Sequence, residues 1–241
     1  MRYLLAILIF IISFSAKSQN IVIGTVGSPC IGASGINFCD KTCVFIGNSI
    51  TRGVLPVNLG NQKWTSVFCH AKYATELNMG IDGQTMSNSC GIVVFNPATI
   101  PAYNPSTHSA LFISLGENDI GWNSGGAGST PAEFKTAYTT AVTSAISTYG
   151  WPPSRVILLA PYQPYSWNAY VGACGTSVAA DAARALSYVK VTEDVASENG
   201  CLYRNVYAAM NGLDATYFDV DGLHPNAVGD SVIANFLITS L

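Results

Sequence analysis

The amino-acid sequence predicts an α/β fold with a central, mostly parallel five-stranded sheet. Short apolar runs alternate along the chain with amphipathic stretches, which is typical of repeated strand–helix units. No internal repeat or linker divides the chain into comparable halves, so we expect one domain. Five segments are the predicted strands: Cys43 to Ile46, Ala74 to Met79, Ala110 to Leu115, Val156 to Ala160 and Leu202 to Tyr207.

Two helices are indicated by their capping signals and by the spacing of their apolar residues. Thr130 precedes the first, followed by a proline and by Glu133 at the third helical position, the arrangement called a capping box. Apolar residues then recur at helical spacing as far as Tyr149, and Gly150 ends the run. The second helix is predicted from about 178 to 199, and one face of it carries Val178, Ala182, Ala185, Leu186 and Val189. Each helix leads directly into a predicted strand, as the winding of a parallel sheet requires.

Composition and charge exclude two broad classes of protein. Hydrophobic residues make up 49% of the 241 residues and charged residues only 10%, so the bulk of the chain is not intrinsically disordered. The 11 basic and 14 acidic residues give a formal net charge of -3. Because the basic residues are scattered rather than gathered in a stripe, we expect no nucleic-acid partner.

The first 18 residues have the features of a secretory signal peptide. Arg2 is followed by an apolar run, and Ala16 and Ser18 are small residues of the kind that flank a cleavage site. The alternative is a membrane anchor, but the apolar run from Tyr3 to Phe14 is well short of the ~20 residues that span a bilayer. We therefore expect a secreted or periplasmic protein without stable membrane association, with an N-terminal extension over 19–42 and one domain over 43–241.

Seven cysteines suit an oxidising compartment, and their odd number leaves at least one thiol unpaired. Cys43 is the predicted free thiol, since it lies inside an apolar run that predicts a buried strand. Sequence order favours pairing Cys30 with Cys39, Cys69 with Cys90, and Cys174 with Cys201, although fifteen connectivities are open to six cysteines. The three histidines, His70, His108 and His224, show no metal-ligand spacing. The sequence thus predicts no metal and no other cofactor.

Four polar segments stand where catalytic groups of a parallel sheet collect, at the carboxyl ends of strands and in the last loop. Taken singly, each has an ordinary structural explanation, such as a helix N-cap for Ser49 or a simple turn for the glycines. The segments are Gly47-Asn48-Ser49, Asn78 to Thr85, Gly116-Glu117-Asn118-Asp119 and Asp221-Gly222-Leu223-His224.

Together and in this order, the four segments resemble the SGNH hydrolase superfamily, also called GDSL esterases and lipases, over about residues 43 to 241. The resemblance implies a three-layer α/β/α sandwich of the flavodoxin-like type and a serine esterase that needs no cofactor. It makes Ser49 the nucleophile, with His224 and Asp221 completing a catalytic triad. It also makes Ser49, Gly83 and Asn118 the donors of an oxyanion hole.

Three positions leave alternatives open. The family usually has Gly-Asp-Ser where this chain has Asn48, and an asparagine keeps hydrogen bonds of similar reach while it loses a charge. Gly80 is an alternative to Gly83, which we prefer because Gly-x-Thr closes that block in the family pattern. Asp219 is an alternative to Asp221, but the step of three residues to His224 matches the family.

The residue types at this site predict acyl transfer through an acyl-enzyme. Long loops between the predicted strand ends carry aromatic side chains that would suit stacking on sugar rings: Trp122, Tyr162, Tyr165 and Trp167. The alternative is that these aromatics only pack the loops onto the core. We expect a monomeric esterase that removes short acyl groups, such as acetyl groups on carbohydrate. A lipase or acyltransferase with the same triad, or a catalytically silent glycan-binding protein, are the other functions considered.

Overall fold

A computed structural model describes residues 30–53, 61–87, 93–121, 129–162, 164–165 and 178–241 of the chain. At the centre is a five-stranded sheet in the order β2-β1-β5-β6-β7, and every neighbouring pair is parallel. The strands are β1 (Thr42–Gly47), β2 (Thr75–Asn78), β5 (His108–Ser114), β6 (Val156–Leu159) and β7 (Leu202–Arg204). The predicted fold class is therefore confirmed, and each predicted strand segment overlaps one strand of the sheet.

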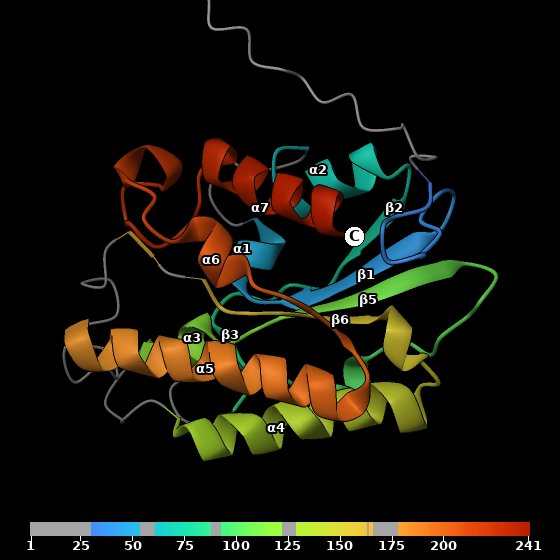
Figure 1. Cartoon of the computed structure of the whole chain (residues 1–241), viewed down its shortest axis with the longest axis horizontal. Coiled ribbons are helices and arrows are strands. Elements are labelled where there is room, and N and C mark those ends of the chain that lie inside the picture. Colours follow the sequence, from blue (N-terminus) through green and yellow to red (C-terminus); the bar gives the residue numbers. More distant parts are fainter. Residues whose placement is uncertain (1–29, 54–60, 88–92, 122–128, 163, 166–177) are drawn as a thin grey trace, which may run out of the picture.

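Helices cover both faces of the sheet and give the fold three layers (Figure 1). One face carries α3 (Glu117–Gly121), α4 (Pro131–Thr143) and α5 (Val178–Asn199), and the other α1 (Ser49–Arg52), α2 (Trp64–Ala71), α6 (Val206–Met210) and α7 (Ala227–Ser240). The short strands β3 (Gln84–Thr85) and β4 (Val93–Val94) form a separate parallel pair. Single-turn helices lie at Pro97–Thr99, Pro153–Arg155 and Ala215–Tyr217.

Both predicted helices are present. The hydroxyl of Thr130 accepts a hydrogen bond from the N–H of Glu133, whose carboxylate in turn accepts the N–H of Thr130, so the capping box is complete. A π-helical segment, Ser144–Thr148, continues α4. The face predicted for α5 was partly wrong: Ala185 is buried as predicted, but Leu186 is exposed, and Tyr188 and Val195 are buried on that helix although they were not predicted.

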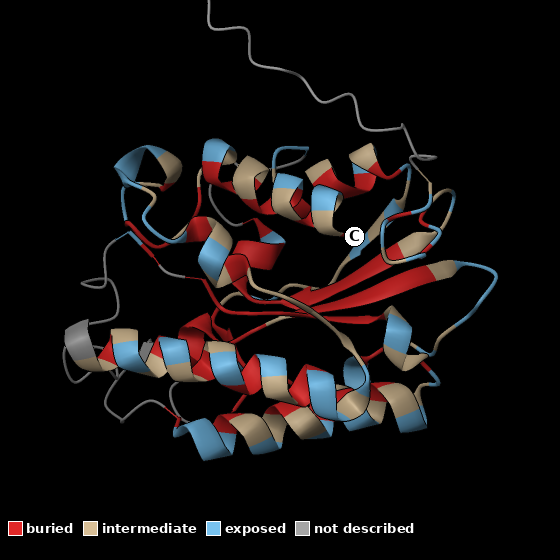
Figure 2. Cartoon of the chain, in the orientation of Figure 1, coloured by how far each residue is buried: buried red, intermediate tan, exposed pale blue. Residues whose placement is uncertain are grey.

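The alternation of side chains along the strands divides the core into two clusters. From β1 and β5, Val44 and Leu111 point into the cluster under α4 and α5, whereas Phe45 and Phe112 point into the cluster under α2 and α7. The rings of Phe45 and Phe112 stack with their centroids 4.7 Å apart. Figure 2 shows the buried strands between helices whose outer faces are exposed. The central strands β1, β5 and β6 are thus buried on both faces, as expected for parallel strands.

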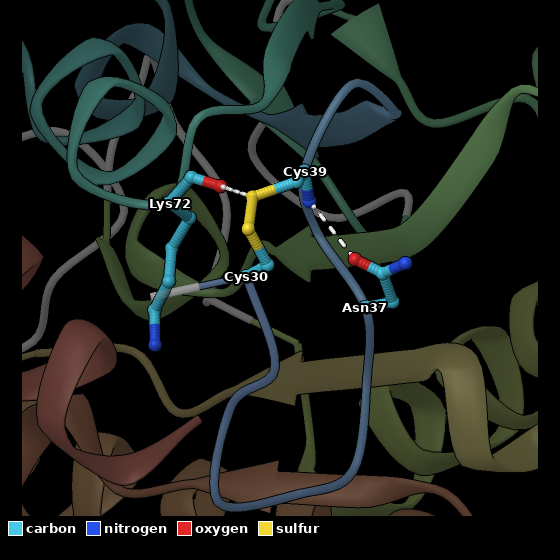
Figure 3. The surroundings of a disulfide bond; sticks show 4 residues. All are labelled: Cys30, Asn37, Cys39 and Lys72. Carbon is cyan, nitrogen blue, oxygen red and sulfur yellow. Dashed lines mark hydrogen bonds between the residues drawn. A yellow bond between two sulfur atoms is a disulfide. The ribbon is translucent and has the colours of Figure 1, made fainter. Parts of the chain in front are cut away.

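The described part of the predicted N-terminal extension contributes to this core. A disulfide joins Cys30 to Cys39, and the loop between them buries Ile36 and Phe38 in the cluster under α2 and α7 (Figure 3). The N–H of Cys39 donates to the side-chain oxygen of Asn37, and its sulfur lies 3.7 Å from the carbonyl oxygen of Lys72. Residues 1–29, which include the predicted signal peptide, lie outside the described residues.

The other cysteines differ from the predicted pairing. Cys43 is free and buried, as predicted, and its sulfur lies 3.1 Å from the hydroxyl oxygen of Ser109. Cys69 and Cys201 also carry free thiols, so the bridges predicted from sequence order were wrong for them. Cys69 faces Cys43 inside the core, and the thiol of Cys201 donates to the carbonyl oxygen of Asn199 at the end of α5. Their predicted partners, Cys90 and Cys174, lie outside the described residues.

Candidate active site

The turn from β1 into α1 presents Ser49 at the carboxyl edge of the sheet. A Cβ atom at Gly47 would lie 2.0 Å from the hydroxyl oxygen of Thr51, so only glycine allows so tight a turn. Asn48 is the N-cap, and its side-chain oxygen accepts the N–H of Ile50 at 3.0 Å. The N-cap explanation of Ser49 was therefore wrong: because Asn48 caps the helix, the Ser49 hydroxyl is available for another partner.

That partner is His224, and the two side chains form a row with Asp221. The Oγ atom of Ser49 lies 2.8 Å from Nε2 of His224, and Nδ1 of the same ring lies 2.6 Å from Oδ2 of Asp221. The other oxygen of Asp221 accepts the N–H groups of Leu223 and His224. Burial alone would raise the pKa of Asp221, but these hydrogen bonds outweigh it and lower the pKa to about 2. Asp221 is therefore a carboxylate at any ordinary pH.

Asp219, the alternative acid, has a different set of contacts. Its N–H donates to the carbonyl oxygen of His224 at 2.8 Å, and its Oδ1 atom accepts the N–H of Val220. These contacts shape the loop, whereas the imidazole ring bonds to Asp221.

Gly83 and Asn118 are brought together through Gln84. Gly83 is buried in a turn with φ +69°, where a side chain would strain the backbone. The side-chain amide of Asn118, on α3, donates to the carbonyl oxygen of Gln84 at 2.9 Å. Gly80 has a packing role, because a Cβ atom there would lie 2.6 Å from the main-chain nitrogen of Arg52 on α1.

Two buried acids stand on either side of Asn118, and sequence reasoning treated them only as part of a polar turn. Burial raises the pKa of Glu117 to about 7, although hydrogen bonds from its own N–H, Asn48 and Tyr162 act in the opposite direction. Burial likewise raises the pKa of Asp119 to about 6, against hydrogen bonds from Ser87 and Met86. Two acids within five residues of the end of a buried strand are the signal that could have identified them.

The predicted aromatic rim is only partly described. Tyr162 was expected at the rim but is 1% exposed, and its hydroxyl donates to the carbonyl oxygen of Leu223, so the expectation of an exposed ring was wrong. Tyr165 is 52% exposed and stacks on Phe218, with ring centroids 6.4 Å apart. The rings of Tyr165 and Phe218 line a cavity of about 420 Å³ together with Asp219 and Asp221. Trp122 and Trp167 lie outside the described residues.

Two properties of the described residues bear on cofactors and membranes. In the described ranges, no three histidine, cysteine, aspartate or glutamate side chains gather in a way that could hold a metal ion. None of the helices described here has the length and apolar character needed to cross a bilayer.

Solved structures with the same fold include several ester hydrolases. A carbohydrate acetylesterase from Sinorhizobium meliloti has a TM-score of 0.62 at 16% identity, covering 82% of this chain and 96% of its own. The aryl esterase of M. smegmatis has a TM-score of 0.61 at 17% identity, with the same coverage. A lipase/acylhydrolase from Enterococcus faecalis has a TM-score of 0.57 at 18% identity, covering 82% of this chain and 93% of its own. At these identities the likeness establishes the fold. No curated protein matches the chain in sequence.

Family membership follows from the sequence match. Residues 45–232 match the GDSL-like lipase/acylhydrolase family, a span that includes every site residue described above. The protein is accordingly a carboxylic ester hydrolase. The chain belongs to the GDSL-like lipase/acylhydrolase family, as its resemblance to GDSL esterases implied.

Proposed function

We propose that the protein is a secreted serine esterase in which Ser49, His224 and Asp221 act as a catalytic triad. The observation that carries this proposal is the continuous row of hydrogen-bonding atoms from Ser49 Oγ through His224 to Asp221 Oδ2. A serine hydroxyl is a weak nucleophile, and a neighbouring imidazole activates it by accepting its proton.

In the first half of the reaction, Ser49 Oγ attacks the ester carbonyl and Nε2 of His224 takes the hydroxyl proton. Asp221 keeps the other ring nitrogen protonated and stabilises the imidazolium that forms. His224 then gives the proton to the departing alcohol, which leaves an acyl group on Ser49. In the second half, His224 takes a proton from water, the resulting attack releases the acid, and the proton returns to Ser49.

The oxygen of the tetrahedral intermediate needs hydrogen-bond donors, because negative charge develops on it. We assign this role to the N–H groups of Ser49 and Gly83 and to the amide of Asn118. An amide nitrogen carries two N–H bonds. One bond from Asn118 goes to Gln84, which fixes the side chain and leaves the second for the substrate.

Acetylated carbohydrate is the proposed substrate class. The cavity beside Asp221 offers the exposed ring of Tyr165, and an aromatic face suits the C–H surface of a sugar. One structure of the same fold is a carbohydrate acetylesterase, which makes this chemistry a natural one to test. Secretion rests on the N-terminal sequence, with cleavage proposed after Ser18. The mass of the protein recovered outside the cell tests it, because the mature chain would begin at Gln19.

The central experiment compares the wild type with Ser49→Ala on p-nitrophenyl acetate. We expect turnover by the wild type and a loss of at least about 1000-fold in the variant. Ser106→Ala is the matched control, since Ser106 is exposed in the loop that leads into β5, and it should leave the rate unchanged. Wild-type turnover that is indifferent to Ser49 would refute the triad, and binding of glycan without any turnover would favour the silent binding protein.

A second comparison addresses the substrate. Acetylated xylo-oligosaccharides, p-nitrophenyl acetate and a long-chain p-nitrophenyl ester are offered to the same preparation. A higher kcat/KM for the acetylated sugar supports the proposal, whereas a preference for the long chain would point to a lipase. Transfer of the acetyl group to an added sugar, rather than to water, would point to an acyltransferase.

A further inference from the structure

We propose that Glu117 is a positioning residue that aligns the turn carrying Ser49 with the loop carrying His224. The inference rests on the proposed triad and concerns a group that touches neither substrate nor reacting atoms. It follows from the contacts of one carboxylate, on α3, with two other segments of the chain.

The first contact ties Glu117 to the nucleophile turn. Asn48 has one amide, and the two ends of that amide serve different partners: the oxygen accepts the N–H of Ile50, and the nitrogen donates to Oε2 of Glu117 at 2.8 Å. Asn48 and Glu117 are 1% and 2% exposed, so water does not compete for these bonds. The orientation of Asn48, and with it the start of α1 at Ser49, is therefore fixed from both sides.

The second contact connects Glu117 to the histidine loop. Its other oxygen, Oε1, accepts the N–H of Tyr162 at 3.4 Å, just beyond the end of β6. The buried hydroxyl of Tyr162 donates to the carbonyl oxygen of Leu223, the residue before His224. Glu117 itself lies on α3, directly before Asn118. A chain of hydrogen bonds thus runs from the nucleophile turn through Glu117 to the histidine loop.

The pair of residues at 48 and 117 explains why this chain has asparagine before its serine. Both oxygens of Glu117 act as acceptors, so the group facing them at position 48 has to be a donor. An aspartate there would place a second carboxylate against Glu117 in a buried site, where like charges repel strongly. The negative charge that the family pattern has at the residue before the serine lies, in this chain, on α3.

The reverse arrangement satisfies the same hydrogen bonds and provides the test. In the double variant Asn48→Asp with Glu117→Gln, one oxygen of the new carboxylate would cap α1 and the other would accept an N–H of the new amide. The oxygen of that amide would accept the N–H of Tyr162. Either change alone leaves these hydrogen bonds unsatisfied. Glu117→Gln places an N–H of the new amide against another N–H donor, and Asn48→Asp places two carboxylates next to each other.

Three variants, Glu117→Gln, Asn48→Asp and the double variant, are compared with the wild type on p-nitrophenyl acetate. We expect each single change to lower kcat about 10- to 100-fold with little change in KM, since a misplaced nucleophile slows chemistry. The double variant should recover to within about threefold of the wild type, because its hydrogen bonds are restored. Glu198→Gln, an exposed glutamate on α5, is the matched control and should leave the rate unchanged.

A pH series adds a readout that a merely structural role would not move. Charged and titratable groups that act on Glu117 are Asp119 from α3 and Tyr138 from α4, and burial raises the pKa of both, so that each ionises less readily. With its pKa at about 7, Glu117 itself is ionised above that pH. Below it Glu117 is a neutral acid and resembles glutamine, so the ratio of wild-type to Glu117→Gln rates should shrink from about pH 8.5 to about pH 5.5. Taking the ratio cancels the titration of groups that both proteins share.

The outcomes separate this inference from the proposed triad. If Ser49→Ala is inactive while Glu117→Gln keeps more than half of the wild-type kcat, the triad stands and the positioning role is overturned. A rate ratio that is flat with pH, or a double variant that is folded but no faster than the slower single variant, overturns it as well. Melting temperatures are measured for all variants. If a single variant does not fold, the double variant decides alone, since its full set of hydrogen bonds predicts a folded and active enzyme.

Discussion

The carboxyl end and the amino end of the sheet contribute differently to the stability of the fold. At the carboxyl ends of the strands, Glu117 and Asp119 are buried carboxyl groups whose pKa is raised by burial. At the amino end, the Cys30–Cys39 loop places Phe38 in the core, and Ser34 donates through its N–H and its hydroxyl to the carbonyl oxygen of Leu241. Desolvated acids destabilise a fold, whereas apolar burial and a cross-link stabilise it. The destabilising groups thus lie beside the proposed triad, and the stabilising ones lie at the opposite end of the sheet.

The largest expected effect is a loss of activity from a change at the carboxyl end of the sheet. Asp221→Asn should lower kcat/KM on p-nitrophenyl acetate by about 1000- to 10,000-fold, because the amide no longer holds His224 in the tautomer that accepts a proton from Ser49. The melting temperature should change little, since the side chain of Asp221 is partly exposed. Because the pKa of Asp221 is about 2, any loss of wild-type activity between about pH 7 and pH 5 arises from another group. Steady-state rates and thermal melts on the same samples would check this, and a residual rate near the wild-type value would contradict it.

A smaller effect should appear at the opposite end when the cross-link is removed. Cys30→Ser with Cys39→Ser opens a loop of sequence separation 9, and the entropy of loop closure predicts a loss of about 2–3 kcal/mol of stability. Because the disulfide lies at the other end of the sheet, kcat at about 25 °C should stay within about twofold of the wild type. Urea unfolding followed by circular dichroism measures the stability. A large drop in kcat at an unchanged stability would show that the two ends are coupled.

The smallest expected effect is on the pH dependence of stability. Asp230, on α7, is 1% exposed, and burial raises its pKa to about 8, since the N–H of Trp64 offsets the burial only in part. A carboxyl group whose pKa is raised on folding lowers stability as pH rises between its ordinary value near 4 and about 8. Asp230→Asn should therefore stabilise the protein by about 1–2 kcal/mol at pH 8, and by almost nothing at about pH 4.

The control for this variant is Asp40→Asn. Asp40 is exposed with φ +59°, a conformation that asparagine also adopts, so the substitution should be neutral at both pH values. Urea unfolding at the two pH values gives the comparison. An Asp230→Asn variant that is stabilised equally at both would contradict the buried-acid explanation.

Much of the fold was predictable because local signals and long-range packing agree. The strands β1, β5 and β6 contain apolar runs too short for helices, and the start of α4 is determined by a capping box that involves only Thr130 and Glu133. Among the described residues, five helices were not predicted, and the two longest of them, α2 and α7, lack a capping box. No side chain caps α2 at Lys63, and α7 is so apolar throughout that no polar face marks its period.

The candidate site was likewise predictable only in part. Ser49, Asp221 and His224 lie in short motifs whose order along the chain is informative, and the structure brings their side chains together. The contact between Asn48 and Glu117 joins residues 69 positions apart, and the burial of Tyr162 depends on how other segments of the chain cover its ring. Neither can be deduced from spacing, because both are set by how the strand ends are juxtaposed in space. The predicted bridge from Cys69 failed for a similar reason, since Cys69 is directed inward by the face of α2 on which it lies, whereas the predicted Cys30–Cys39 bridge is present.

The free cysteines make the two faces of the sheet separately observable. Cys43 and Cys69 are inside the cluster under α2 and α7, while Cys201 packs against the cluster under α4 and α5. The buried thiols of Cys43 and Cys69 react with an alkylating reagent only when the layer of α2 and α7 opens, whereas the thiol of Cys201 is only partly buried and reacts more readily. Pulse labelling in dilute denaturant, with the modified peptides identified by mass, would therefore record the opening of the α2 and α7 layer from natural side chains, with Cys201 as an internal reference on the other face.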